Sequence, residues 1–170
     1  MDSTGAEVDG VEVTVKAIGK VISPFKKLEE MPIQPKGAAD VEGVVEIAPR
    51  YAEGLKDLEG FSHLYLIYLF HRAERTELSV VPFMDTVERG VYATRSPLRP
   101  NHIGLSVVEL VRVEGRRVII RGVDLLDQTP VLDIKPYIAR FDEVKESRSG
   151  WMRADAAAVA EKRSDSRFVD

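Results

Sequence analysis

Residues 94–106 contain the densest group of side chains that could bind a charged ligand. Within thirteen positions the stretch has two prolines, two arginines, an asparagine, a histidine and a glycine. Neither helical periodicity nor strand alternation runs through it, which predicts a loop. The prolines fix their own φ angles and restrict the residues before them, so the loop should be stiff. We expect four polar side chains to project from it: Arg95, Arg99, Asn101 and His102.

A stiff loop that displays hydrogen-bond donors suits a charged ligand with several functional groups. The alternative interpretation is a plain connection between two strands, with its arginines in solvent. The arginines of residues 89–121 bear on this choice: there are seven, with only two acids, which gives this segment a net charge of +5 in a chain of net charge −4. The segment could form a local positive face, or its charges could simply be solvated.

A second charged pair lies at Asp133 and Lys135. Both alternate with the apolar residues Leu132 and Ile134, so the two charges share one face of a predicted strand. They could form a structural ion pair, or they could face the amine and the carboxylate of a ligand.

The chemistry of cysteine and of metal ions is not indicated. The chain has no cysteine, which excludes disulfides and thiolate zinc sites, and its three histidines do not follow a metal-ligand spacing. Phosphate-binding glycine loops and the Gly-x-Ser-x-Gly motif are absent. We interpret His63 as a packed, hydrogen-bonded side chain. His71 and Arg72 could rim a site at the end of a buried strand, or could merely end that strand.

Short strands separated by turn residues must position these groups. A short helix is predicted over residues 49–59, and residues 114–116 should form a hairpin turn. This pattern indicates an all-β fold, a compact β-barrel of mostly antiparallel strands with one or two short helices. The predicted strands are residues 11–22, 41–48, 62–71, 90–93, 105–113, 117–124 and 131–137.

The strand over residues 62–71 is apolar on both faces, although a small barrel has only one interior. Whichever set points outward must be covered, either by a second copy of the chain in a two-fold contact or by a C-terminal helix. We therefore expect a homodimer. The two alternating sets are Leu64, Leu66, Tyr68 and Phe70, and Tyr65, Ile67 and Leu69.

The chain is expected to divide into three parts. Residues 1–10 form a disordered tail, residues 11–146 form the barrel domain, and residues 147–170 form a C-terminal helix and tail, with the helix favoured over 152–163. No apolar run has the length of a membrane span, and the first residues lack the features of a signal peptide. We expect a cytoplasmic protein without a membrane partner. The negative net charge argues against sequence-blind coating of nucleic acid, so no DNA partner is expected.

Several sequence motifs, in order along residues 16–142, resemble the TsaA-like family, also called TrmO. They are Ile18-Gly19-Lys20-Val21-Ile22-Ser23-Pro24-Phe25, Pro32-Ile33-Gln34-Pro35, Gly54-Leu55, Phe61-Ser62-His63-Leu64, Ala93-Thr94-Arg95-Ser96, Arg99-Pro100-Asn101, Ile103-Gly104-Leu105-Ser106, Asp124-Leu125, Asp127, Thr129-Pro130 and Asp133-Ile134-Lys135-Pro136-Tyr137. Two positions depart from the family pattern: His102 stands where proline is frequent, and Gln128 where glycine is usual. Longer members carry an additional C-terminal domain, which we expect this chain to lack.

The resemblance implies an S-adenosyl-L-methionine-dependent tRNA (adenine-N6)-methyltransferase, usually a homodimer, built on a β-barrel. The implied substrate is threonylcarbamoyl-adenosine beside the anticodon of tRNA. Asp133 is the candidate acceptor for the proton of the amine, and Arg95 the candidate partner of a carboxylate. The implied cofactor contacts are Gln34, Pro35, Lys36, His71, Arg72, Arg95, Ile103, Asp133, Ile134, Lys135 and Pro136. A non-catalytic RNA-binding barrel and a small-molecule-binding barrel remain as alternatives.

Overall fold

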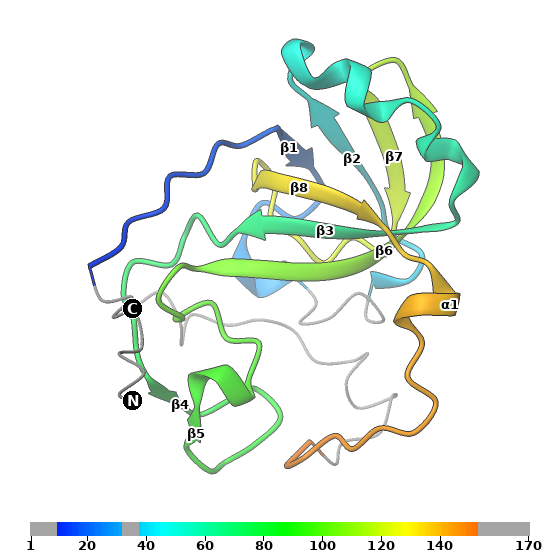
Figure 1. Ribbon diagram of the computed structural model, residues 1–170. Helices are drawn as coiled ribbons and strands as arrows, with labels where there is room; N and C mark the ends of the chain where they lie inside the picture. Colours follow the sequence, from blue (N-terminus) through cyan, green and yellow to red (C-terminus); the bar gives the residue numbers. More distant parts are fainter. Residues whose placement is uncertain (1–9, 32–37, 153–170) are drawn as a thin grey trace, which may run out of the picture.

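Six strands close into an antiparallel barrel (Figure 1). The computed structural model describes residues 10–31 and 38–152. Around the barrel the strands follow the order β1-β2-β7-β6-β3-β8, and β8 pairs with β1 to complete the circle. The strands are β1 (Gly19–Ile22), β2 (Glu42–Ile47), β3 (His63–Leu69), β6 (Ile103–Glu114), β7 (Arg117–Arg121) and β8 (Pro130–Pro136). The predicted all-β barrel is thus confirmed.

Alternation along each strand fills the interior of the barrel. On β3, Leu64, Leu66 and Tyr68 are buried, whereas Tyr65 and Ile67 on the opposite face are only half-buried. The inward residues of β3 pack in one core with inward residues of the other strands. The sequence did not decide which of the two alternating sets on this strand faces the interior. The structure shows that the set containing Leu64 points inward. The predicted hairpin is present, with Gly115 at φ 60 between β6 and β7.

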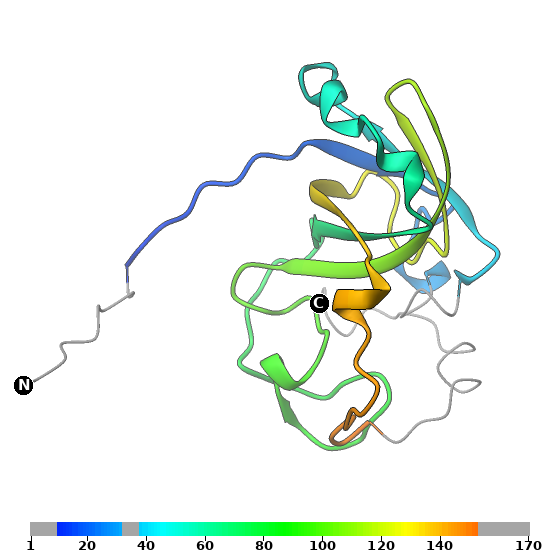
Figure 2. The same ribbon diagram turned by 45° about the vertical axis from the view of Figure 1, so that its right-hand side comes forward.

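The first predicted strand is much shorter than its period-two pattern suggests. Only Ile18 and β1 bond to neighbouring strands, and residues 10–17 run away from the barrel (Figure 2). Val13 on this segment is 80% exposed. The reason lies in β2: its ladder with β1 ends at the pair Gly19↔Ile47, and Pro49 then begins a turn that takes the chain off the sheet. Alternation is therefore present here without a partner strand.

The helix predicted over residues 49–59 is replaced by two 3-10 segments, η3 (Pro49–Leu55) and η4 (Leu58–Gly60). They are separated at Asp57, whose φ of 65 is left-handed and cannot continue a right-handed helix. Tyr51, Leu55 and Leu58 from these segments nevertheless all pack against the barrel core.

A small lobe lies beside the barrel (Figure 1). It contains the two-stranded sheet of β4 (Ser79–Val80) and β5 (Arg89–Gly90), followed by the 3-10 segment η5 (Val91–Ala93). The strand predicted over residues 90–93 is therefore mostly a 3-10 turn. Val80 and Leu98 form a separate apolar cluster in this lobe, with Phe83 packed against it.

Two short helices and an irregular segment complete the described chain. Segment η1 (Leu28–Glu30) follows β1, and helix α1 (Ala139–Asp142) follows β8. Residues 143–150 are exposed and lead to Trp151, whose ring nitrogen donates to the Ala93 carbonyl over 2.8 Å. The end of the described chain is thus attached to the lobe beside residue 94. Across residues 10–31 and 38–152, no helix has the length and apolar character needed to cross a membrane.

Three sequence predictions lie wholly or almost wholly outside the described residues. The C-terminal helix expected over 152–163 falls almost entirely within residues 153–170, and the tail expected over 1–10 within residues 1–9. The predicted cofactor contacts Gln34, Pro35 and Lys36 fall within residues 32–37, which are also outside the described part of the chain.

Candidate functional site

The loop over residues 94–102 is held by its own hydrogen bonds. Thr94 and Ser96 are buried, and their hydroxyl oxygens accept from the backbone N–H of Ser96 and of Leu98, respectively. The Arg99 guanidinium donates to the Thr94 carbonyl over 3.0 Å and to the Ser96 carbonyl over 3.2 Å. The predicted stiffness therefore has a structural cause beyond the two prolines.

The expectation that all four polar side chains project from this loop is wrong for Arg99 and His102. Arg99 folds back on the loop, and His102 Nδ1 lies 2.8 Å from the Pro97 carbonyl oxygen. His102 also has a φ of 50, which a proline ring cannot adopt. Proline, which is frequent at this position in the family, is therefore incompatible with the backbone conformation seen here. Arg95 remains exposed at the loop surface.

The arginine-rich segment does not form one positive face. Arg89 pairs with Asp85, Arg112 and Arg117 with Glu114, and Arg121 with Glu42 and Glu109. Arg99 and Arg116 instead donate to backbone carbonyls. Most of the positive charge that the sequence suggested is therefore locally neutralised or used in folding. Arg95 and Arg99 both lie in the loop predicted to bind ligand, and Arg95 is the exposed one of the two.

Three adjacent strands bring several predicted cofactor residues onto one outward face. Ile103 lies opposite Leu69 in the β3–β6 ladder, and Asp133 lies opposite Ile67 in the β3–β8 ladder. Cross-strand neighbours have side chains on the same side of a sheet. Ile103 and Asp133 therefore flank β3 on the outside of the barrel, separated along it by two residues.

The charges on this face form an ion pair. Lys135 Nζ lies 2.9 Å from Asp133 Oδ2, and Asp133 Oδ1 accepts from the Ile134 backbone N–H over 2.9 Å. Both charged side chains remain about half exposed or more. Between them and Ile103 lie Tyr65, Ile67 and Leu69. On the other side of β3, the exposed Leu105 and Val107 of β6 extend this apolar surface.

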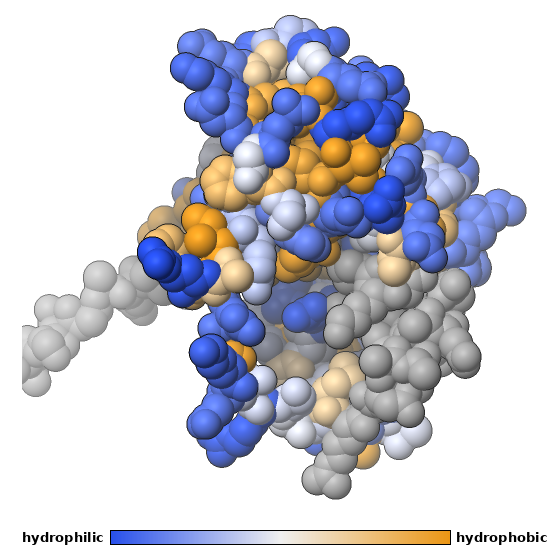
Figure 3. Space-filling view, turned by 90° about the vertical axis from the view of Figure 1, so that its right-hand side faces the viewer, coloured by the Kyte–Doolittle hydropathy of each residue, from blue (hydrophilic) through white to orange (hydrophobic). Residues whose placement is uncertain are grey.

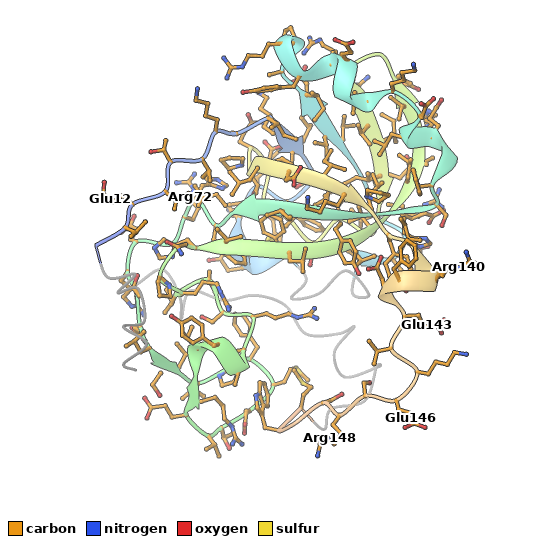
Figure 4. All side chains as sticks on the ribbon, in the orientation of Figure 1. Glu12, Arg72, Arg140, Glu143, Glu146 and Arg148 are labelled. Atoms are coloured by element: carbon orange, nitrogen blue, oxygen red, sulfur yellow. The ribbon has the colours of Figure 1, made fainter. Side chains whose placement is uncertain are left out.

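The remaining predicted contacts are distributed around this face. Ile134 packs against the core of the barrel rather than outward, and Pro136 lies opposite Leu64 at the far end of β3. His71 and Arg72 form a turn just after β3, and burial lowers the pKa of His71, with a further lowering from the charge of Arg72. Figure 4 shows Arg72 on the opposite side of the molecule from Arg140 and Glu143. His71 and Ile103 lie at the same end of the barrel, because Phe70 N donates to the His102 carbonyl.

A hollow separates the barrel from the lobe. Figure 3 shows the surface drawn inward between the barrel above and the lobe below. The loop over residues 94–102 connects these two parts, since it leaves η5 in the lobe and enters β6 in the barrel.

A buried polar chain inside the barrel was not predicted as part of the site. Tyr68 Oη lies 3.1 Å from Ser106 Oγ, and Ser106 Oγ donates to Asp124 Oδ1 over 2.9 Å. All three residues are less than a tenth exposed. The signal was present in the sequence: Ser106 shares the inward face of its strand with Val108, and a buried hydroxyl requires a partner.

The carboxyl group of Asp124 has an unusual proton affinity. Burial raises the pKa of Asp124 to about 7, although the Ser106 hydrogen bond and the Arg95 charge lower it. Burial also raises the pKa of Tyr68, and the Asp124 charge adds to this effect. Within residues 10–31 and 38–152, no group of three or more histidines and carboxylates is placed to hold a metal ion.

The fold and the ordered motifs agree with comparisons to known proteins. Residues 20–143 match the model of the tRNA-methyltransferase O N-terminal domain. A probable S-adenosyl-L-methionine-binding protein of Pyrococcus abyssi is 49% identical over 156 residues, which cover 92% of this chain and 85% of that protein. A tRNA (adenine(37)-N6)-methyltransferase of mouse is 46% identical over 91 residues, which cover 52% of this chain and 21% of the mouse protein.

A solved structure shows the same fold. The crystal structure of TrmO from Pseudomonas aeruginosa superimposes with a TM-score of 0.71 at 40% sequence identity. The match covers 85% of this chain and 63% of the crystallised chain, so this chain spans less than two thirds of that relative. The family model alone covers well over half of the chain. The chain belongs to the tRNA-methyltransferase O family of S-adenosyl-L-methionine-dependent tRNA methyltransferases, which confirms the predicted family, enzyme class and cofactor.

Proposed function

We propose that this chain methylates the exocyclic N6 of threonylcarbamoyl-adenosine beside the anticodon of tRNA, with S-adenosyl-L-methionine as methyl donor. The observation that carries the proposal is the family match over residues 20–143, which includes every predicted cofactor contact. The comparison with the mouse enzyme supports adenine N6 as the acceptor atom. The threonylcarbamoyl group follows from the sequence resemblance.

The described residues fit this cofactor chemically. The outward face offers the apolar side chain of Ile103, which suits an adenine ring, and the carboxylate of Asp133 across β3. Arg95 offers a planar pair of donors that suits a carboxylate, either on the methionine part of the cofactor or on the threonylcarbamoyl group.

S-adenosyl-L-methionine supplies a methyl group on a good sulfonium leaving group, so the protein chiefly has to align the reactants. Asp133 would accept the proton that the adenine amine loses as its nitrogen forms the new bond to carbon. Lys135, 2.9 Å from the same carboxylate, would hold Asp133 in orientation. Arg95 would fix the carboxylate end of its ligand through two parallel hydrogen bonds.

Mass spectrometry of tRNA nucleosides tests the reaction directly. The purified chain is incubated with S-adenosyl-L-methionine and tRNA from cells that lack the gene. We expect threonylcarbamoyl-adenosine to be converted to a species heavier by one methyl group. Unchanged nucleosides, together with no cofactor binding by calorimetry, would favour the non-catalytic RNA-binding barrel. Cofactor binding without a salt-dependent tRNA complex would favour the small-molecule-binding barrel.

We further propose a homodimer in which the outward face of β3 and β6 forms the contact. The face is apolar and partly exposed, with Leu105 and Val107 beside the outward residues of β3. A two-fold contact would cover it and bring a second chain close to Ile103 and Asp133. The tRNA substrate implies that the enzyme works in the cytoplasm. Light scattering of the full chain and of a chain that ends at Glu146 distinguishes a second copy from a C-terminal helix as the cover.

A further inference from the structure

The single tryptophan of the chain joins the segment after α1 to the lobe. Residues 143–150 are exposed throughout and run from α1, beside the barrel, toward the lobe (Figures 1 and 2). Trp151 follows them and is half-buried. A turn at Gly150, whose φ of 57 favours glycine, presents the tryptophan side chain. Residues 143–152 are called the strap below.

Trp151 contacts both ends of a short stretch of the lobe. Its indole N–H donates to the Ala93 carbonyl over 2.8 Å, and Arg89 Cζ lies 5.7 Å from the centre of its ring. A cation within about 6 Å of an indole face is attracted by the ring. Ala93 is the last residue of η5, and carbonyls at the end of a helical segment have no partner within it. The indole supplies a donor to this carbonyl from a distant part of the sequence.

Arg89 is held in place by its own contacts. Its Nε donates to Asp85 Oδ2 over 2.8 Å, and its Nη2 lies 2.7 Å from the same oxygen. The other oxygen of Asp85 accepts from the backbone N–H of Thr86 and of Val87. Because the carboxylate orients the guanidinium, the tryptophan ring meets a partner that is already fixed. The strap therefore docks on a preformed surface of the lobe.

The docked tryptophan completes the support of the backbone around Arg95. The carbonyls of residues 93, 94 and 96 each accept a hydrogen bond from a side chain. Arg99 supplies two of these bonds from within the loop, whereas Trp151 supplies the one at the entry to the loop. Arg95 is thus flanked on both sides by carbonyls that are held. A backbone that is fixed beforehand loses less conformational entropy when a ligand binds.

We propose that Trp151 is a positioning residue for ligand binding, through which the strap holds the loop that bears Arg95. The inference rests on the proposed function, because that function gives Arg95 a carboxylate to bind. If docking of Trp151 strengthens ligand binding, ligand binding must strengthen the docking of Trp151 by the same factor. The docking can be measured directly, since no other tryptophan contributes to the fluorescence of the chain.

Replacement of the ring tests the proposal first. Cofactor affinity by calorimetry and single-turnover methyl transfer are measured for the full wild-type chain, Trp151→Ala and Trp151→Phe. Whichever quantity Arg95→Ala reduces, Trp151→Ala should reduce by about five- to tenfold, the lower end of the usual coupling between sites. Trp151→Phe keeps a ring beside Arg89 but has no N–H donor for Ala93, so it should show most of the loss. It carries the same comparison if Trp151→Ala does not fold.

A double-mutant cycle distinguishes positioning from a general loss of structure. In an Arg95→Ala background, Trp151→Ala should cost little further, since the group that it positions is gone. Phe141→Ala is the matched control, because it removes an aromatic ring that is 75% exposed just before the strap, and it should behave like the wild type. Wild-type behaviour of both Trp151 variants, or equal losses in both backgrounds, would overturn the inference.

Fluorescence gives a readout that a merely structural role would not change. Arg89→Gln removes the charge over the ring but keeps a donor for Asp85, so docking of Trp151 should become incomplete and acrylamide should quench its fluorescence more strongly. Addition of S-adenosyl-L-methionine, alone or with the nucleoside threonylcarbamoyl-adenosine, should restore the protection seen in the wild type. The addition that restores it identifies whose carboxylate Arg95 binds. Unchanged quenching after both additions would overturn the coupling.

Failure of the proposed function would give a different result. A wild-type chain that binds no S-adenosyl-L-methionine, or that binds it and methylates no tRNA, would overturn the proposed function. A wild type that binds and methylates, with both activities unchanged in Trp151→Ala and Trp151→Phe, would overturn this inference alone.

Discussion

At the scale of single residues, the chain places two carboxylates in opposite environments. Asp133 is about half exposed and ion-paired with Lys135 on the outside of the barrel. Asp124 is buried, hydrogen-bonded to a serine and influenced by Arg95 at a distance. The exposed group is accessible to a substrate proton, whereas the buried group is not. The same residue type therefore behaves differently according to burial and partners.

Replacing Arg95 by alanine should reduce cofactor binding or methyl transfer far more than stability. Arg95 lies on an exposed part of the loop, so its truncation creates no cavity. Arg95→Lys should restore little activity, because an ammonium group cannot reproduce the planar pair of donors. Single-turnover methyl transfer and thermal unfolding are measured for both variants. Full activity of Arg95→Ala would rule out its role.

The pKa of Asp124 also predicts how stability depends on pH. The group binds its proton more tightly in the folded state, with a pKa of about 7 against an ordinary value of 3.8. Its contribution should therefore lower the free energy of unfolding as pH rises from about 4 to about 7, by at most about 4 kcal/mol at about 1.4 kcal/mol per pKa unit. Denaturant unfolding of the wild type and Asp124→Asn measures the difference. A difference that does not change with pH would contradict the assigned pKa.

At the scale of secondary-structure elements, backbone constraints decide where strands end and how they approach. Pro49 takes the chain away from β1, and a left-handed Asp57 divides the following turn. Gln128 is also left-handed, with a φ of 66, just before β8. The residue that departs from the usual glycine therefore occupies a conformation that glycine adopts without strain. Its side chain partly compensates by accepting from Lys20 Nζ over 2.9 Å.

Gln128→Gly should stabilise the chain by about 1 kcal/mol, because a non-glycine residue in the left-handed region costs roughly 1–2 kcal/mol. Loss of the exposed hydrogen bond from Lys20 offsets only part of this gain. Denaturant unfolding measures the change, and Lys20→Ala provides the contribution of the hydrogen bond alone. Destabilisation by Gln128→Gly larger than that of Lys20→Ala would show that the turn is not strained.

Gly104→Ala should destabilise the barrel by about 1–3 kcal/mol, the usual effect of overpacking a core. The added methyl group would overlap the Tyr68 ring, which must move and loosen its contact with Ser106. Gly54→Ala is the control, because a Cβ at that position meets no atom within 4 Å. In a Tyr68→Leu background the cost of Gly104→Ala should largely disappear. A cost that persists there would point to a backbone effect instead.

At the scale of the whole molecule, local pattern predicted the strands well, and contacts distant in sequence decided the rest. Periodicity identified every barrel strand and the hairpin, but it also extended the first strand through residues 11–17, which no strand of the described chain pairs with. Arg121 is neutralised by Glu42, 79 residues away, which composition within one segment cannot reveal. The Tyr68–Ser106 contact joins residues 38 apart in the sequence, and the same serine donates to Asp124. The carboxylate that partners Ser106 could therefore be identified only after the strands were assembled.

The assembly of two chains is the last consequence that the surface predicts. Leu105 is 55% exposed at the centre of the apolar face of β3 and β6, where a charge would be buried against a partner chain. Leu105→Glu should therefore convert a dimer into a monomer in light scattering. Leu78→Glu is the matched control, because Leu78 is 69% exposed on the lobe, outside this face. If the wild type is a dimer that Leu105→Glu leaves intact, the contact must lie on another surface, and a monomeric wild type would remove the homodimer altogether.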